Sequence, residues 1–312
     1  MKHDFETWAK MWCEYKKPFV KKSTYAMYTF IIGKYLVPFF NNHAVITESL
    51  VQQFVDKEMN TGHHPKTVKG MVTVLRMIAV YASKKQNIMP PIVWELHYTS
   101  QQVQSNDRDN VLNASEYKKL VKHVTKNLSF LNLGILLALT TGMRIGEICA
   151  LQWHDIDTSG GVVNVYKTLE RIYVVEGGEK YSQVIVDSAK TPNSIRQIPL
   201  PRKMIEIITP LAHDVCPEHY VIANSAHPIE PRSFRNHFNR IIDKLKLKNI
   251  TFHGLRHSFA TRCIESMCDY KTLSAILGHS SVSITMNVYV HPGNAQKKKC
   301  IENMLGRIVP DL

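Results

Sequence analysis

The chain has 312 residues, of which 44% are hydrophobic and 21% charged, a balance typical of a globular protein. This length suffices for two domains with separate hydrophobic cores, and no run of eighteen apolar residues predicts a membrane span. Lysine and arginine outnumber aspartate and glutamate both before and after residue 105, and the formal net charge is +13. This excess favours a polyanionic partner, although charge alone does not separate nucleic-acid binders from other basic proteins.

The N-terminus and the cysteines indicate a cytoplasmic protein. The first ten residues lack the apolar segment that follows the basic start of a secretory signal. No two cysteines form a CxxC pair, and their spacing suggests neither a disulfide framework nor a zinc knuckle. We therefore expect free thiols in a reducing compartment at Cys13, Cys149, Cys216, Cys263, Cys268 and Cys300.

The first hundred residues are predicted to be helical. Phe5, Trp8 and Trp12 recur at helical spacing, and a longer apolar stripe runs from Val68 to Ala79. Two helices are expected to begin with basic residues, where backbone N–H groups and the helix dipole can bind phosphate. These lysines could equally form a solvated face. The candidate DNA-binding residues are Lys21, Lys22, Thr24, Lys66, Thr67 and Lys69.

A polar segment divides the chain. We expect domain 1–100, a linker at 101–111, a second domain at 112–293 and a helical tail at 294–312. Asn113 and Glu116 form a capping-box pattern that begins a helix, and residues 130–139 predict a buried one. Alternation between Val162 and Pro201 predicts four strands, after which helices are expected almost to the end.

Arg144 and Glu147 follow an apolar helix and a glycine, in the segment TTGMRIGE. A surface Arg–Glu pair is common and contributes little. The neighbouring Ile145, Ile148 and Leu151 instead indicate a partly buried turn, and a buried arginine needs a strong acceptor such as a carboxylate or a phosphate.

His253, Arg256 and His257 lie at helical spacing in TFHGLRHSFAT. Two histidines four residues apart can bind zinc, but a zinc protease needs glutamate where Gly254 stands, and no third ligand is evident. A His253–Arg256 pair suits a phosphate better.

Lys190, His279 and Tyr289 are unremarkable singly: a hairpin lysine is usually exposed, and a tyrosine among valines usually packs in a core. Together with two arginines they form a different pattern. Phosphodiester cleavage needs charge neutralisation, a nucleophile and an acid for the leaving oxygen. Two arginines can replace a metal, tyrosine can attack, and lysine can donate the proton.

The order Arg, Lys, His-x-x-Arg, His, Tyr resembles the tyrosine recombinase (phage integrase) family. The matching positions are Arg144, Lys190, His253, Arg256, His279 and Tyr289, within TTGMRIGE, SAKTPNSIRQIPL, TFHGLRHSFAT and LGHSSVSITMNVYVH. The specific motifs cover residues 112–291, and residues 5–85 more weakly resemble the family's core-binding domain. The resemblance implies a mainly α-helical fold with a small antiparallel β-sheet: a helical, SAM-like core-binding domain and a mixed α+β catalytic domain.

The resemblance also implies roles. Arg144 and Arg256 would clamp the scissile phosphate, and Tyr289 would attack it to give a 3′-phosphotyrosyl link. Lys190 would protonate the leaving oxygen. His253 would assist as base or hydrogen-bond donor, and His279 would hold the phosphate in the transition state. Glu147 would support the Arg144 turn. No metal or cofactor is implied.

Members of this family act as homotetramers on two DNA sites, so the expected partner is double-stranded DNA with specific core sites. An accessory factor such as an excisionase is a further expected partner, and no membrane is expected. The tail at 294–312 could pack on its own domain or on a neighbouring subunit. The sequence starts directly at the core-binding region, without the N-terminal arm-binding domain that many integrases of mobile elements carry. Either the protein is a simple recombinase, or the sequence is a truncated one from which that domain is missing.

Several functions share these motifs. We expect an integrase that serves integration and excision of a phage or mobile element. A Xer-type resolvase of chromosome dimers and a DNA invertase would use the same chemistry. A type IB topoisomerase-like enzyme and a catalytically dead DNA-binding regulator are the more distant alternatives.

Overall fold

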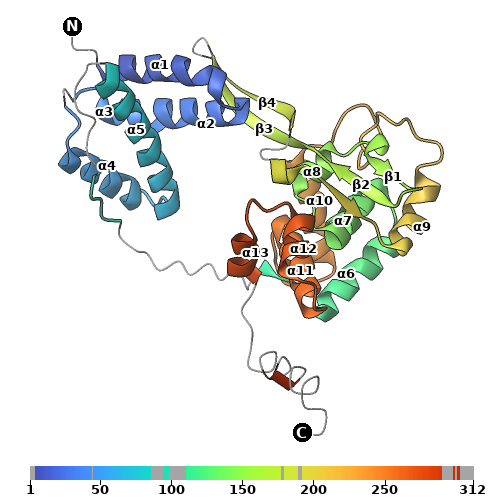
Figure 1. Cartoon of the computed structure of the whole chain (residues 1–312). Helices are drawn as coiled ribbons and strands as arrows, with labels where there is room; N and C mark the ends of the chain where they lie inside the picture. Colours follow the sequence, from blue (N-terminus) through green and yellow to red (C-terminus); the bar gives the residue numbers. More distant parts are fainter. Residues whose placement is uncertain are drawn as a thin grey trace. The chain divides into compact units, whose positions relative to one another are not determined.

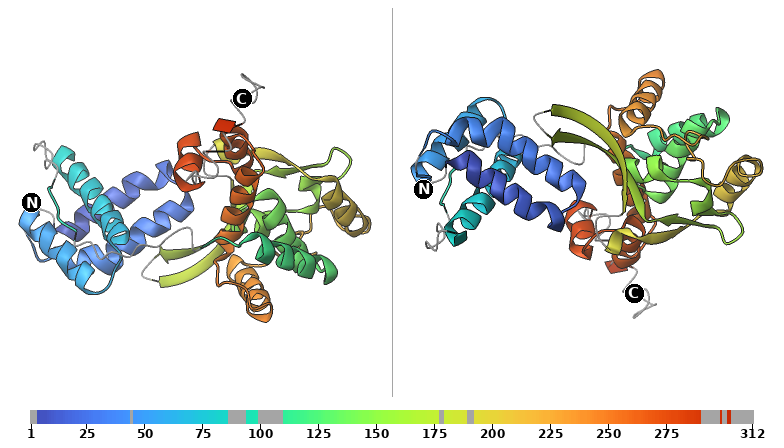
Figure 2. Two further views of the ribbon diagram at one scale, coloured as in Figure 1. Left: turned by 90° about the horizontal axis from the view of Figure 1, so that it is seen from below. Right: turned by 90° about the horizontal axis from the view of Figure 1, so that it is seen from above.

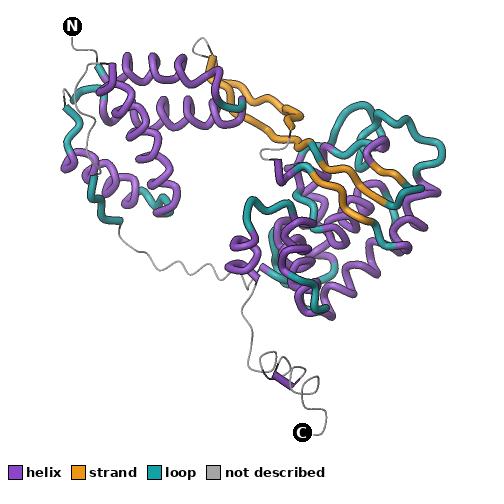
Figure 3. The backbone as a smooth tube through the Cα atoms, viewed as in Figure 1, coloured by secondary structure: helices purple, strands orange, loops and turns teal. Residues whose placement is uncertain are grey.

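The computed structural model describes residues 4–43, 45–85, 94–98, 110–176, 179–188 and 192–289, together with 298, 301 and 302. These residues are mainly helical with small antiparallel sheets, as predicted (Figure 3). They group into two compact units, Met1–Gln104 with Arg171–Ile185, and Ser105–Glu170 with Val186–Leu312. No helix in the described part is long and apolar enough to cross a bilayer.

The part of the first unit before residue 86 is built from helices that enclose an aromatic core. Asp4 caps the first helix by accepting a 2.8 Å hydrogen bond from the Thr7 amide, and Pro65 begins the longest helix, where its missing N–H is harmless. The elements are α1 (Phe5–Lys16), the 3₁₀ turn η1 (Lys17–Phe19), α2 (Lys22–Ile31), the π-helical η2 (Ile32–Leu36), α3 (Val37–Phe40), α4 (Glu48–Asn60) and α5 (Pro65–Lys85) (Figure 1).

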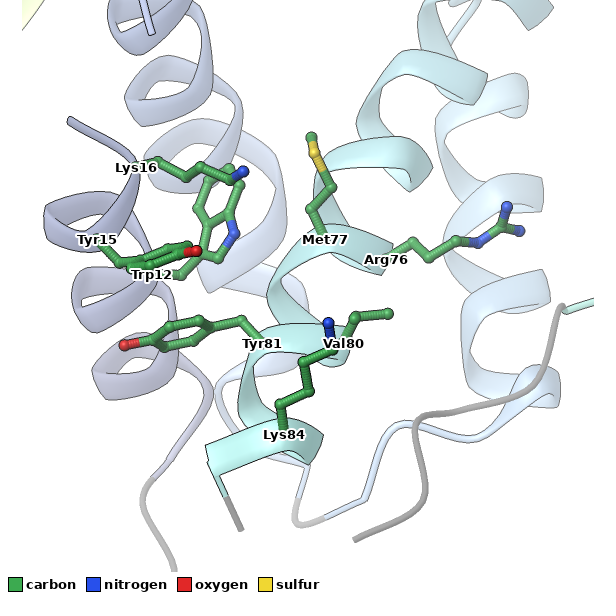
Figure 4. Close-up of a pocket in the computed structure, with 8 residues that line it drawn as sticks. All are labelled: Trp12, Tyr15, Lys16, Arg76, Met77, Val80, Tyr81 and Lys84. Carbon is green, nitrogen blue, oxygen red and sulfur yellow. The ribbon is translucent and has the colours of Figure 1, made fainter. Parts of the chain in front are cut away.

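Rings from three of these helices meet in that core. Phe40 lies between Phe5 and Phe54, with ring centroids 5.6 and 5.2 Å away. On the surface of the same unit, the Tyr15 and Tyr81 rings stack at 5.1 Å beside an open pocket of about 340 Å³. None of the predicted site residues lines this pocket, whose walls are Trp12, Tyr15, Lys16, Arg76, Met77, Val80, Tyr81 and Lys84 (Figure 4).

The second unit combines helices with strands. Its helices are α6 (Ala114–Lys126), α7 (Phe130–Thr141), α8 (Ile145–Ala150), α9 (Arg202–Leu211), α10 (Pro231–Lys244), α11 (Phe252–Glu265), α12 (Tyr270–Leu277) and α13 (Val282–Tyr289). Short 3₁₀ turns are η4 (Trp153–Asp155) and η5 (Pro192–Ser194). The strands are β1 (Ile156–Asp157), β2 (Val162–Val165), β3 (Lys167–Glu176), β4 (Glu179–Ser188) and β5 (Arg196–Pro199); residues 171–185 of the β3–β4 hairpin group with the first unit.

Helix α7 lies at the centre of this unit, as its unbroken apolar sequence predicts. Every residue from Asn132 to Leu139 is buried, because α6, α8, α10 and α11 all pack against it. The predicted capping box of α6 is confirmed: the Asn113 and Glu116 side chains each accept a 2.9 Å hydrogen bond from the other's amide. The last helices, α11, α12 and α13, pack on one another (Figure 2).

Strands β1, β2 and β5 form an antiparallel sheet in that order, while β3 pairs with β4. Val163 pairs with Ile198 and Val165 with Arg196, so alternate residues of β2 and β5 face the core. The four predicted strands are confirmed. Strand β1 was not predicted, because two residues carry no alternation.

One prediction for this unit is wrong. Helices do not continue from Pro201 almost to the end, because residues 212–230 form turns and two isolated bridges at Tyr220. Pro217 and Pro228 interrupt the segment, and Asn224 takes a left-handed φ of 46°. Most of the predicted linker and nearly all of the tail lie outside the described residues. The five described cysteines are free thiols, as expected.

Two glycines set the turns that matter below. Gly142 ends α7 with φ of 66°, and Gly278 ends α12 with φ of 65°. A Cβ on Gly142 would lie 2.6 Å from Phe259 and 2.8 Å from Leu277, so both the backbone and the space demand glycine.

We expect Gly142→Ala to lower the free energy of unfolding by about 1–3 kcal/mol through its strained backbone. Gly70→Ala is the matched control, because its Cβ would meet nothing within 4 Å on α5. That control should stabilise the protein by about 0.5–1 kcal/mol. Urea unfolding checks both, and equal effects would contradict the assignment of Gly142.

Candidate active site

Arg144 is the N-cap residue of α8 and follows the Gly142 turn. Its amide and its Nη1 each donate a 2.8 Å hydrogen bond to the Glu147 carboxylate, which fixes the turn that follows the buried α7. The Arg144 side chain remains 37% exposed, whereas that of Glu147 is only 6% exposed. Arg144 therefore has a defined position and still presents donors to an incoming anion.

A second arginine, Arg196 of β5, shares the same carboxylate. Its Nη1 and Nη2 donate to the two Glu147 oxygens at 3.1 and 2.9 Å, a forked pair with both side chains almost fully buried. Burial raises the pKa of the Glu147 carboxyl, but Arg196 and Arg144 outweigh it and hold the pKa below its usual range. Glu147 is thus a buried anion between two cations.

Arg256 lies on α11 and is 2% exposed. Its Nη1 donates to the Gly142 carbonyl at 2.9 Å and its Nη2 to the Leu277 carbonyl at 2.7 Å. One guanidinium therefore joins the turn after α7 to the turn after α12, which are far apart in the sequence.

All three arginines donate hydrogen bonds to backbone carbonyls at the end of α12. Arg196 Nε donates to the Ile276 carbonyl at 2.7 Å, Arg256 to Leu277, and Arg144 Nη2 to Gly278 at 3.3 Å. The last carbonyls of a helix lack intrahelical partners and form the negative end of its dipole. Three consecutive carbonyls thus fix three guanidinium groups that come from three different elements.

His279 follows Gly278 and is held by α13. Its Nδ1 lies 2.7 Å from the Thr285 hydroxyl, and Thr285 is fully buried. Burial, followed by the charges of Arg256, Arg144, Arg196 and His253, lowers the pKa of His279 to about 4. The imidazole is therefore neutral near pH 7 and can donate a hydrogen bond without adding charge.

The remaining predicted catalytic residues are placed in part. His253 is exposed on the first turn of α11, with its ring 4.7 Å from that of His257, and it is near enough to affect the His279 pKa. Tyr289 is the last residue of α13, one helical turn after Thr285. Lys190 lies outside the described residues. Within the described ranges, no three His, Cys, Asp or Glu side chains form a metal-binding group.

The predicted DNA-binding residues lie at two helix N-termini of the first unit. Lys21 occupies the N-cap position of α2, and Lys22 and Thr24 lie in its first turn. Near the start of α5, the exposed residues are Lys66, Thr67 and Lys69. Arg232 and Arg235 are exposed on the first turns of α10 in the second unit.

Arg196 was missed by sequence reasoning, which treated it only as part of a strand. Its partners Glu147 and Ile276 lie 49 and 80 residues away in the sequence. One signal was available in the sequence. Arg196 lies two residues before the core residue Ile198 in a short strand, so both side chains are on the same face, and a buried arginine needs an acceptor.

The lowered pKa of His279 predicts a pH dependence of stability. Between pH 6.5 and about 4 the unfolded chain binds a proton at this residue that the folded chain does not, so the free energy of unfolding should fall as the pH falls through this range. His279→Gln should flatten this part of the curve. Thermal melts from pH 4 to 7 provide the measurement, and identical slopes in both proteins would contradict the assignment.

Comparison with known proteins identifies the family. The phage integrase family model matches residues 110–296, more than half of the chain, and the N-terminal SAM-like domain model of phage integrases matches residues 4–59. Two relatives are 26% identical: the tyrosine recombinase XerC-like protein of Caldanaerobacter subterraneus subsp. tengcongensis, over 84% of this chain and 71% of that protein, and the ICEBs1 integrase of Bacillus subtilis (strain 168), over 87% and 74%.

Solved structures show the same fold. The Tn1549 transposon integrase in complex with circular intermediate DNA superposes with a TM-score of 0.72 at 18% identity, over 95% of this chain and 99% of that one. A lambda integrase dimer bound to a COC′ core site gives 0.64 at 20% identity, over 94% and 79%. The chain belongs to the phage integrase family of site-specific, tyrosine-type DNA recombinases.

Proposed function

We propose that this chain is an integrase that cleaves and rejoins DNA during integration and excision of a phage or mobile element. The observation that carries the proposal is the arrangement of Arg144, Arg256 and neutral His279 around the end of α12, one short helix away from Tyr289. This is a compact donor set for one phosphate, and the part of the chain that the structure describes holds no group of acidic metal ligands beside it.

The reaction follows from the charges. Arg144 and Arg256 neutralise the non-bridging oxygens of the scissile phosphate as negative charge develops on them. Neutral His279 donates a further hydrogen bond. The Tyr289 hydroxyl loses its proton, with His253 as acceptor, and its oxygen attacks phosphorus. The 5′-oxygen leaves with a proton from Lys190.

Religation reverses these steps. The phosphotyrosyl link keeps the free energy of the broken phosphodiester, so no nucleotide cofactor is required. Attack by a 5′-hydroxyl from a second duplex gives strand exchange, which requires two sites and, by analogy with the family, four copies of the chain. We further propose cytoplasmic action on duplex core sites, with an accessory factor setting the direction.

The integrase role draws support from the names of similar proteins, the ICEBs1 integrase and the Tn1549 transposon integrase. Resolution of chromosome dimers is the second candidate, because another relative is named as XerC-like. Both roles use one active site, and the DNA repeats that flank the gene separate them.

Tyr289→Phe should abolish the covalent protein–DNA adduct and leave DNA affinity within about twofold, because only the attacking oxygen is removed. The measurement is an SDS-resistant adduct on a nicked duplex that carries the repeat from the ends of the encoding element. Tyr270→Phe, at the start of α12, is the matched control and should form the adduct. An adduct in the Tyr289→Phe protein would show that the nucleophile lies elsewhere, and loss of the wild-type adduct in EDTA would contradict metal-independent cleavage.

DNA affinity should fall steeply with salt if the two units both contact phosphates. With about six to ten such contacts, affinity falls by about 10³–10⁵ between 50 and 200 mM salt. Lys66→Ala with Lys69→Ala should reduce the slope of log affinity against log salt by about two. The exposed Lys203 of α9 is a control whose replacement by alanine should leave the slope unchanged. An unchanged slope in the Lys66/Lys69 variant would remove these lysines from the DNA interface.

A further inference from the structure

We infer that Arg196 is a positioning residue for DNA cleavage: its guanidinium fixes Glu147 and the end of α12, and so sets Arg144 and the Gly278–His279 turn. It acts through these groups without touching the phosphate. The inference deepens the proposed function and rests on it.

The hydrogen bonds of Arg196 show where its donors go. Nε donates to the Ile276 carbonyl at 2.7 Å, Nη1 to the Ser194 carbonyl and to Glu147 at 3.1 Å, and Nη2 to Glu147 at 2.9 Å. Four of the five N–H groups of a guanidinium can thus be accounted for by protein acceptors. With a side chain only 6% exposed, Arg196 is not presented to a ligand in the way that Arg144 is.

The backbone of Arg196 is itself held. Arg196 begins β5 and pairs with Val165 of β2, and β2 pairs in turn with β1. The guanidinium is therefore anchored to a sheet, whereas the groups that it binds lie on α8 and at the end of α12. The sheet therefore fixes, through Arg196, the positions of Glu147 on α8 and of the end of α12.

The Gly278–His279 turn rests directly on this anchor. A Cβ at Gly278 would lie 3.1 Å from both Cδ and Nη1 of Arg196 and 2.9 Å from the Asn193 carbonyl. The side-chain Nδ2 of Asn193 also donates to the Ser280 carbonyl at 3.3 Å. The segment before and including Arg196 thus contacts residues 278–280 from one side, while Arg144 and Arg256 bind the carbonyls of the same turn.

Two other roles are open to a buried arginine. As a third phosphate ligand it would contribute to DNA binding, but its forked pair with the Glu147 carboxylate already supplies it with an anion, whereas Arg256 donates to the neutral carbonyls of Gly142 and Leu277. As an ion pair that only stabilises the fold, it would affect melting but not the rate of cleavage by the folded protein. A positioning role predicts a lower rate of cleavage by the folded protein and an unchanged affinity for DNA.

The test compares Arg196→Met and Arg196→Lys with wild type in single-turnover adduct formation, on the nicked repeat duplex at saturating protein. Because a displacement of about 1 Å can cost about 10²-fold, we expect Arg196→Met to cleave about 100-fold more slowly with DNA affinity within about twofold. Arg196→Lys should retain part of the rate, since one ammonium replaces the charge but not the planar fork. Arg202→Met, on the 93% exposed Arg202 of α9, is the matched control and should cleave at the wild-type rate.

Three results would overturn the inference. These are an Arg196→Met rate close to that of wild type, a loss that appears in affinity rather than rate, and full additivity with Arg144→Lys. If Arg196 acts through Glu147 on Arg144, the second substitution must cost less in the presence of the first. If Arg196→Met does not fold, Arg196→Lys is compared with wild type at a temperature below the melting point of the variant. We then expect the cleavage rate of Arg196→Lys to be at least about tenfold lower than that of wild type. A wild-type rate would exclude the positioning role.

Failure of the inference can be told from failure of the proposed function. If wild type forms no adduct, or Tyr289→Phe still forms one, the proposed cleavage chemistry is wrong whatever Arg196 does. If Tyr289→Phe abolishes the adduct and Arg196→Met cleaves normally, only the positioning role is wrong.

Discussion

The second unit depends on one interaction: three arginines donate to three consecutive carbonyls at the end of α12. The carbonyls of Ile276, Leu277 and Gly278 would otherwise remain without partners in a partly buried turn, which is costly. Their donors come from β5, α11 and the start of α8. The end of one eight-residue helix therefore joins parts of the chain that are separated by more than a hundred residues.

Three cations this close together would repel one another without compensation. Glu147 supplies one full negative charge, and the helix end supplies partial negative charge. A positive surplus remains, and after burial it is the second cause of the lowered pKa of the neighbouring His279 imidazole. The same surplus favours a phosphate, which would enter a site whose cations are already oriented and so would require little reorganisation.

Local patterns were sufficient for much of this structure. The capping box at Asn113, the apolar α7 and the glycine that ends α7 each depend on neighbouring residues, and they were readable from the sequence. Family motifs marked Arg144, Arg256 and His279, and the structure brings these three to one helix end. The importance of Arg196 was not readable, because it arises from partners 49 and 80 residues away. The grouping of residues 171–185 with the first unit is likewise a tertiary property that strand alternation does not encode.

The carbonyl arrangement on α12 also limits how this protein can vary. A single inserted residue would rotate the helix end by about 100° and advance it by about 1.5 Å. The last three carbonyls would then no longer lie opposite the arginines that bind them. Substitutions on the exposed side of the helix, at Lys271 or Ala275, leave the backbone where it is. Among relatives, the number of residues between Asp269 and Gly278 should therefore be conserved more strictly than the side chains on that face, so that the length of α12 is a better marker of a working site than its surface composition.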